Sequence, residues 1–160
     1  MSIAKPVGAG KTEEVKLDSA ASHLLEECRM VLPGIQALFG FQLIAVFNDG
    51  FDHKLSPPER QLHFLALFLV ALAAAFVMAP AAIHRQSQQR EVSERFIWLS
   101  SILLRISMLP LALGLTLDVY LIAIVVFGTP GLGLAFAAAL LLVLLVLWMV
   151  LPRLEGRRSR

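Results

Sequence analysis

The clearest candidate for chemistry is Asp118, a carboxylate inside the apolar run TLDVYLIAIVVFG, residues 116–128. An aspartate at the centre of a membrane helix costs about 2.5–3.5 kcal/mol, whereas each surrounding Leu, Ile, Val or Phe contributes about 0.3–0.6 kcal/mol. The run can therefore still span a bilayer. Because removal from water disfavours the charged form of a carboxyl group, Asp118 is a candidate for exchanging a proton and a cation. The alternative is a protonated or hydrogen-bonded residue that only joins helices.

Helical spacing predicts the surroundings of Asp118. Ser100, Ser107 and Gly114 recur every seven residues and Asp118 follows one turn later, so the four share a face that should point into a bundle. If its helix leaves the membrane near residue 127, Asp118 lies about 14 Å inside, close to the midplane. Gln36, on a polar face of the first apolar segment, is its predicted buried partner and a candidate ion ligand.

Four further side chains form a predicted supporting network, namely Glu26, Arg29, Arg105 and Ser107. Arg105 is thirteen residues from Asp118, too far around and along the helix for the two to pair. We expect Arg105 to extend toward the cytoplasmic headgroups, or toward Glu26 or its neighbour on the first helix.

Other polar residues carry structural interpretations. Gln42 lies on a different side of the first segment from Gln36 and is assigned to packing or an oligomer contact. His63 and His84 flank the second segment at opposite ends, which is typical of interfacial anchors. The sequence lacks a nucleophile–base pair, an HExxH motif and paired cysteines, so we expect no enzyme activity, no catalytic residue, no metal and no cofactor.

The elements that position these residues must be membrane helices. The chain is 58% hydrophobic and 16% charged, against about 45–50% and about 25% in soluble domains. A helix needs about 20 apolar residues to cross a hydrocarbon core of about 30 Å. We predict an all-α integral membrane four-helix bundle with spans at about 31–47, 62–83, 104–127 and 132–151, a flexible cytoplasmic tail at 1–18 and a basic cytoplasmic tail at 152–160.

Two features refine this topology. The third apolar stretch is long, so we expect it to tilt, to kink at Pro110 or to project from the membrane. Eleven lysines and arginines lie in the two tails and the middle loop, against two in the other loops, which predicts cytoplasmic termini. The net charge of +2 reflects this bias, so a nucleic-acid partner is not implied.

Small residues four apart predict helix packing in lipid. They occur as Ala71, Ala75 and Ala79 in the second segment and as Gly133 and Ala137 in the fourth. These seams favour a homo-oligomer or another membrane protein as partner, in addition to the lipid bilayer.

Three stretches carry a family resemblance: LLEECRMVLPGIQALFGFQLIAVF at 24–47, ALAAAFVMAPAAIHR at 71–85 and LDVYLIAIVVFG at 117–128. Together they resemble a family of small four-helix bacterial membrane proteins of unassigned function, often labelled sodium:proton antiporters. The resemblance implies a multi-pass protein of the bacterial inner membrane. Our leading hypothesis is transport of Na⁺ or another monovalent cation, or of H⁺, with Asp118 as the exchanging carboxylate. The competing hypothesis is a non-transporting membrane scaffold or an accessory subunit of a larger complex.

Overall fold

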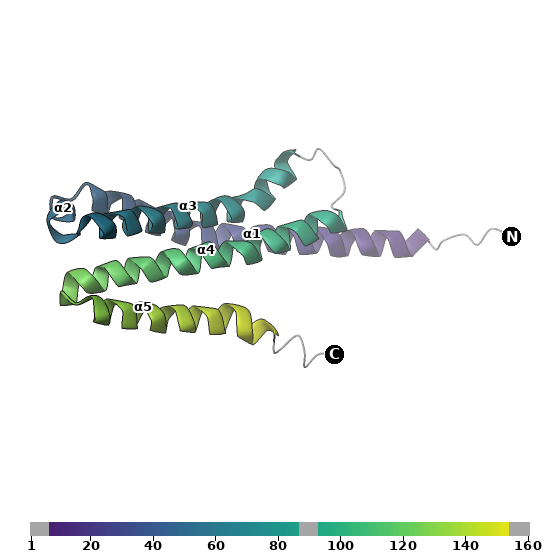
Figure 1. The fold of residues 1–160 in the computed structure, drawn as a ribbon. Coiled ribbons are helices and arrows are strands. Elements are labelled where there is room, and N and C mark those ends of the chain that lie inside the picture. Colours follow the sequence, from purple (N-terminus) through teal and green to yellow (C-terminus); the bar gives the residue numbers. More distant parts are fainter. Residues whose placement is uncertain (1–6, 87–92, 154–160) are drawn as a thin grey trace.

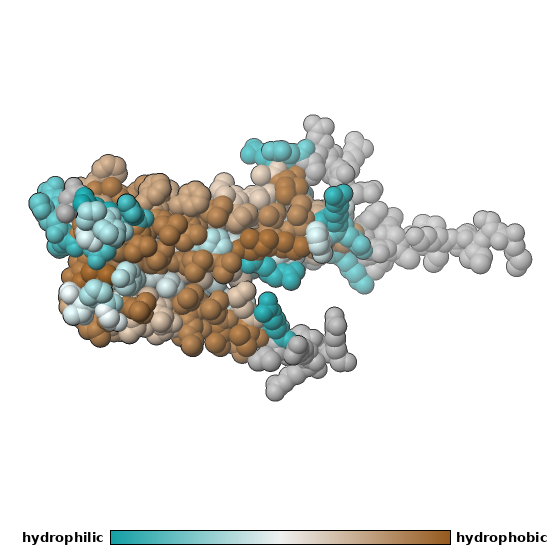
Figure 2. All heavy atoms as spheres, viewed as in Figure 1, coloured by the Kyte–Doolittle hydropathy of each residue, from teal (hydrophilic) through white to brown (hydrophobic). Residues whose placement is uncertain are grey.

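The computed structural model describes residues 7–86 and 93–153 of the chain. Each of four helices is long and apolar enough to cross a membrane, which confirms the predicted all-α four-helix membrane fold. The helices are α1 (Val7–Val46), α3 (Pro57–Gln86), α4 (Glu94–Phe127) and α5 (Pro130–Leu145), with the short helix α2 (Gly50–Lys54) between the first two. A π-helical turn, Val146–Val150, continues α5 toward Arg153. Figure 2 shows a broad hydrophobic surface along these helices, with hydrophilic residues gathered at their ends.

Helix α1 is longer than its apolar segment. The sequence predicts a flexible tail at 1–18, whereas α1 already begins at Val7. No proline interrupts the chain between Val7 and Asp18, and Glu, Lys and Leu in that stretch favour a helix. Residues 7–18 are therefore helical, and residues 1–6 lie outside the described chain. At the other end Pro152 and Arg153 extend the last helix, and residues 154–160 are outside the described chain.

Helices α3 and α4 form the centre of the molecule and share its largest helix contact (Figure 1). Helix α1 packs on both, whereas α5 packs on α4. The central core consists of buried side chains from α1 and α3, namely Cys28, Ile35, Val70 and Val77. The packing of α1 on α3 thereby fixes which face of α1 turns toward α4.

Gly114 sets the closest approach of the two central helices. A Cβ atom at this position would lie 2.8 Å from Val70 Cγ2 and 3.2 Å from the Ala66 backbone oxygen. Only a hydrogen at the Cα therefore allows α3 and α4 to approach so closely. Asp118 follows one turn later on α4, so this contact also positions the carboxylate beside α3.

The two predicted small-residue seams differ in how deeply they are buried within the chain. Gly133 and Ala137 are buried against α4, as predicted for a packing face. In the predicted seam on α3, Ala75 is exposed and Ala71 and Ala79 are partly buried, so the most buried face of α3 within the chain is a different one. That face contains the buried α3 residues His63, Ala66, Val70, Ala73, Val77 and Pro80.

Proline affects α3 and α4 differently. Helix α4 continues through Pro110 as one helix of 34 residues, about 51 Å long, and so extends beyond a hydrocarbon core of about 30 Å. Figure 1 shows the last turns of α3 bending away from α4. Pro80 lies inside this helix and removes one backbone hydrogen bond, which accounts for the bend.

Candidate functional site

Three polar side chains from three helices meet near the end of the molecule that carries α2. Gln42 of α1 donates a hydrogen bond from Nε2 to Asp118 Oδ2 of α4, at 2.6 Å. His63 of α3 places Nε2 3.0 Å from the backbone oxygen of Gln42. A carbonyl oxygen only accepts, so Nε2 is the nitrogen that carries the proton. Gln42, His63 and Asp118 are referred to below as the Asp118 cluster.

The Asp118 cluster lies close to the α2 end of the helices. Gln42 is four residues from the end of α1, about 6 Å along its axis, and His63 is six residues from the start of α3, about 9 Å. Asp118 itself is nine residues, about 14 Å, from the end of α4. The partners contributed by α1 and α3 therefore lie nearer the helix ends than the midplane position predicted for Asp118.

A cavity of about 430 Å³ opens beside the cluster, and we call it the Asp118 cavity. The carboxylate and its partners lie in a wall that is otherwise mainly apolar, while Asn48 and Lys54 bring polar groups from the α2 region. Phe51 of α2 also contacts the His63 ring edge to face, with centroids 5.2 Å apart. The other residues lining the cavity are Leu38, Phe41, Ala45, Gly50, Leu55, Leu121, Ile122, Val125 and Val126.

Of the two polar atoms in the Gln42 amide, the nitrogen has a hydrogen-bond partner and the oxygen has none among the described residues. The Gln42 side chain is 4% exposed, and Oε1 is buried with no hydrogen-bond partner within residues 7–86 and 93–153. An unpaired buried acceptor costs about 1–3 kcal/mol, so such groups call for an explanation. Here the orphan oxygen belongs to the same amide that binds the carboxylate. The arrangement thus offers an unmet acceptor beside an acid, which suits a proton donor or a small cation.

The structure brings Asp118 together with a glutamine other than the one predicted. Gln36 is exposed on α1, so its assignment as the buried partner of Asp118 is wrong. Gln36 and Gln42 are six residues apart, which places them about 120° apart around the helix. The buried face of α1 instead follows a seven-residue repeat through Ala21, Cys28, Ile35 and Gln42. This repeat was the signal in the sequence that could have identified Gln42.

The predicted supporting network does not assemble around Asp118. Glu26 and Arg29 are exposed on α1. Arg105 is also exposed, and its Nε donates to the Ser101 backbone oxygen at 3.2 Å. Arg105 and Glu26 form no ion pair in the described part of the chain.

Ser107 is buried, and its hydroxyl donates to the Leu104 backbone oxygen of its own helix at 2.7 Å. The inward-facing stripe itself is confirmed, because Ser100, Ser107 and Gly114 are all buried and Asp118 is partly buried. The stripe is a packing face that ends at the cluster, and Ser107 makes no hydrogen bond to Asp118.

His63, predicted to be an interfacial anchor, is buried and hydrogen-bonded to α1. The sequence does not predict the hydrogen bond between His63 and α1, because that bond depends on how α1 and α3 cross. No group of three or more His, Cys, Asp or Glu side chains that could hold a metal occurs among residues 7–86 and 93–153.

Comparison with known proteins gives a family and no assigned activity. No curated protein and no solved structure matches the chain. One family model matches residues 10–152, which include all four long apolar segments and every residue of the Asp118 cluster. The chain belongs to this family, the family of unknown function DUF6328.

Proposed function

We propose that this protein exchanges protons for monovalent cations across the bacterial inner membrane, with Asp118 as the exchanging carboxylate. The observation that carries the proposal is the hydrogen bond of 2.6 Å between Gln42 and Asp118 beside a cavity of about 430 Å³. An acid used only to join helices needs a partner but no adjacent cavity. An exchanging acid needs both, because its ligand must reach it.

Gln42 is suited to both charge states of the acid. When Asp118 is ionised, the amide Nε2 donates to it, as in the structure. When Asp118 is protonated, its hydroxyl becomes a donor, and rotation of the amide by half a turn would present Oε1 as the acceptor. A glutamine can thus stabilise either state without a change in helix position.

The unpartnered Oε1 also supports a cation as the alternating ligand. Hard cations bind oxygen atoms, and unwound or unpaired carbonyl groups supply such oxygens in membrane transporters. Turning the Gln42 amide by half a turn would exchange Nε2, which now donates to Asp118, for the unpartnered Oε1, so that a negative and a neutral oxygen would face a cation together. A bound Na⁺ would neutralise the same carboxylate that a proton neutralises, so the two ligands would compete.

The proposed orientation has both termini in the cytoplasm. It is supported by the excess of lysine and arginine in the tails and the middle loop. The start of α1 and the end of α5 lie at the end of the molecule away from α2 (Figure 1). In this orientation the Asp118 cavity faces the outer side of the membrane.

The test is a transport assay with the full-length protein in liposomes that contain a trapped pH-sensitive dye. A pH gradient is imposed, and Na⁺ or K⁺ is then added outside. We expect a cation-driven pH change with the wild-type protein and a loss of at least about tenfold with Asp118→Asn. Asp49→Asn is the matched control, because Asp49 is an exposed acid at the same end that does not line the cavity.

Two results would refute the proposal. One is a wild-type protein that gives no cation response, which would leave the scaffold or accessory-subunit hypothesis. The other is an unchanged response in Asp118→Asn, which would remove the carboxylate from the exchange.

A further inference from the structure

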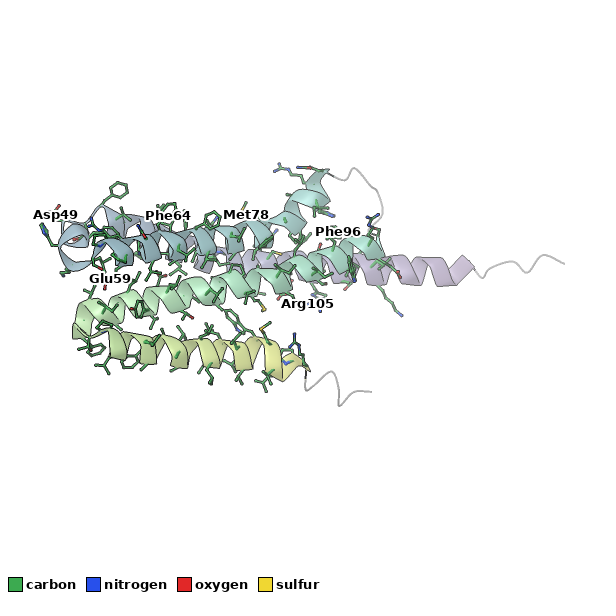
Figure 3. All side chains as sticks on the ribbon, viewed as in Figure 1. Asp49, Glu59, Phe64, Met78, Phe96 and Arg105 are labelled. Carbon is green, nitrogen blue, oxygen red and sulfur yellow. The ribbon has the colours of Figure 1, made fainter. Side chains whose placement is uncertain are left out.

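A second cavity lies between α4 and the far end of α5. It has a volume of about 290 Å³, and we call it the arginine cleft because it contains Arg105 and Arg153. Figure 3 shows Arg105 on α4, on the side toward the last turns of α5. The remaining walls are largely apolar and consist of Met108, Leu109, Ala112, Leu144, Leu145, Trp148, Met149 and Pro152.

Local helix geometry holds these residues on facing surfaces. On α4 the lining residues are spaced at zero, three, four and seven positions from Arg105, which is one helical face. On the last turn of α5 and its continuation through Arg153 they occur as adjacent pairs repeated every four residues. Such a repeat drifts by about 40° per step in a regular α-helix. The wider π-helical turn at Val146–Val150 counteracts this drift and keeps Arg153 on the side of α4.

Among the described residues, the cleft carries two positive charges and no acid. Arg105 and Arg153 come from different helices, and no Asp or Glu of the described ranges lines the cavity. Neither guanidinium forms an ion pair with a carboxylate in residues 7–86 or 93–153, and Arg105 donates to a backbone oxygen through Nε. Two guanidinium groups beside one cavity repel each other unless an anion lies between them. A phosphate group fits both the charge and the donor geometry of arginine.

The position of the cleft favours the phosphate of a lipid headgroup over free phosphate. It lies toward the end of the molecule away from α2, where α5 ends, and contains Trp148, a residue type common at the membrane interface. A free phosphate would need only polar walls, whereas this cavity continues into Met and Leu side chains. Basic pockets between membrane helices on the cytoplasmic side bind acidic lipid headgroups.

We propose that the arginine cleft binds an anionic phospholipid, with the headgroup phosphate between Arg105 and Arg153. Trp148 and Met149 contact the glycerol and the upper acyl chains. This site is separate from the Asp118 cavity and does not depend on transport. Its expected effect is to tie the end of α5 to α4 through a lipid that belongs to the inner leaflet.

The test is lipid binding by the full-length, detergent-purified protein, measured by native mass spectrometry with phosphatidylglycerol. Phosphatidylcholine, which has the same phosphate but no net charge, is the comparison lipid. We expect Arg105→Gln and Arg153→Gln each to weaken phosphatidylglycerol binding about fivefold and the double variant about 25-fold. Arg85→Gln is the matched control, since Arg85 is exposed near the end of α3 and does not line the cleft. It should bind as the wild type does.

Further variants and ligands make the result specific. Arg105→Lys retains the charge but loses the planar fork, so binding should fall between the wild type and Arg105→Gln. Phosphatidylglycerol should also raise the melting temperature of the wild type and not that of the double variant. A thermal unfolding transition of the double variant in the absence of lipid would show that this variant is folded.

Three outcomes would overturn the proposal. Equal loss in Arg85→Gln would mean attraction by general surface charge. Equal binding of phosphatidylcholine would mean recognition of acyl chains alone. Displacement of the lipid by inorganic phosphate at similar concentration would identify a site for free phosphate in place of a lipid.

Discussion

Replacement of Gly114 by alanine tests the contact that holds α3 and α4 together. The added Cβ would lie 2.8 Å from Val70 Cγ2, about 0.7 Å inside the usual separation of carbon atoms. The Val70 side chain has no exposed surface and is branched at Cβ, so it has little freedom to turn away. The second contact, 3.2 Å, is to the Ala66 backbone oxygen and cannot be relieved by a change of rotamer.

The expected cost follows from these two contacts. Overpacking a core costs about 1–3 kcal/mol, whereas glycine to alanine inside a helix returns about 0.8–1.0 kcal/mol. Gly34→Ala is the control, because a Cβ at Gly34 on α1 meets no atom within 4 Å. Both variants gain the same helix propensity, so Gly114→Ala should have a free energy of unfolding about 1–3 kcal/mol lower than that of Gly34→Ala.

The assay is unfolding of the purified protein in mixed micelles of mild detergent and sodium dodecyl sulfate, followed by circular dichroism. The double variant Gly114→Ala/Val70→Ala lacks the obstructing methyl group. Its free energy of unfolding should therefore be about 1 kcal/mol higher than the sum of the two single effects predicts. Equal stability of Gly114→Ala and Gly34→Ala would refute the reasoning, because the close approach would then impose no steric limit.

Three further changes test other contacts. Gln42→Leu removes the amide donor and should slow cation-driven exchange in liposomes about tenfold, whereas Gln36→Leu, on the exposed side of α1, should leave the rate unchanged. Ser93→Ala removes the N-cap hydroxyl that accepts a hydrogen bond of 3.2 Å from the Phe96 backbone N–H, so the free energy of unfolding should fall by about 1 kcal/mol in the same micelle titration. Gly133→Ala would bring a Cβ within 3.1 Å of a backbone oxygen of α4 and should also cost about 1 kcal/mol, and a stabilised variant would contradict that packing.

Hydropathy predicted the membrane helices and not their full lengths. Near α2 and at the α4–α5 connection the predicted span ends at 47, 62, 127 and 132 lie close to the helix ends at Val46, Pro57, Phe127 and Pro130. At the other end α1 and α4 continue well beyond their predicted spans, since they begin at Val7 and Glu94. Hydrophobicity marks where lipid surrounds a helix, whereas backbone hydrogen bonds continue wherever no residue stops them.

The site was predicted in part, for a related reason. Asp118 was recognised because a lone acid in an apolar run needs an explanation. Its predicted partner, Gln36, lies on another face of α1, which also contains Arg29. In lipid the inner face of a helix need not be the polar one, and here it is the face of Cys28, Ile35 and Gln42. The contribution of His63 depends on the crossing of two helices, which the periodicity of one helix does not encode.

The connection between α4 and α5 has a consequence for how freely this chain can change in sequence. Only Gly128, with a positive φ of 67°, and Thr129 separate the two helices. So short a link forces α5 to return beside α4 whatever its side chains are. Specific shape is then required mainly where α5 is buried, at Gly133 and Ala137. Most of the Leu, Val and Ala positions of α5 should therefore accept exchange among apolar residues.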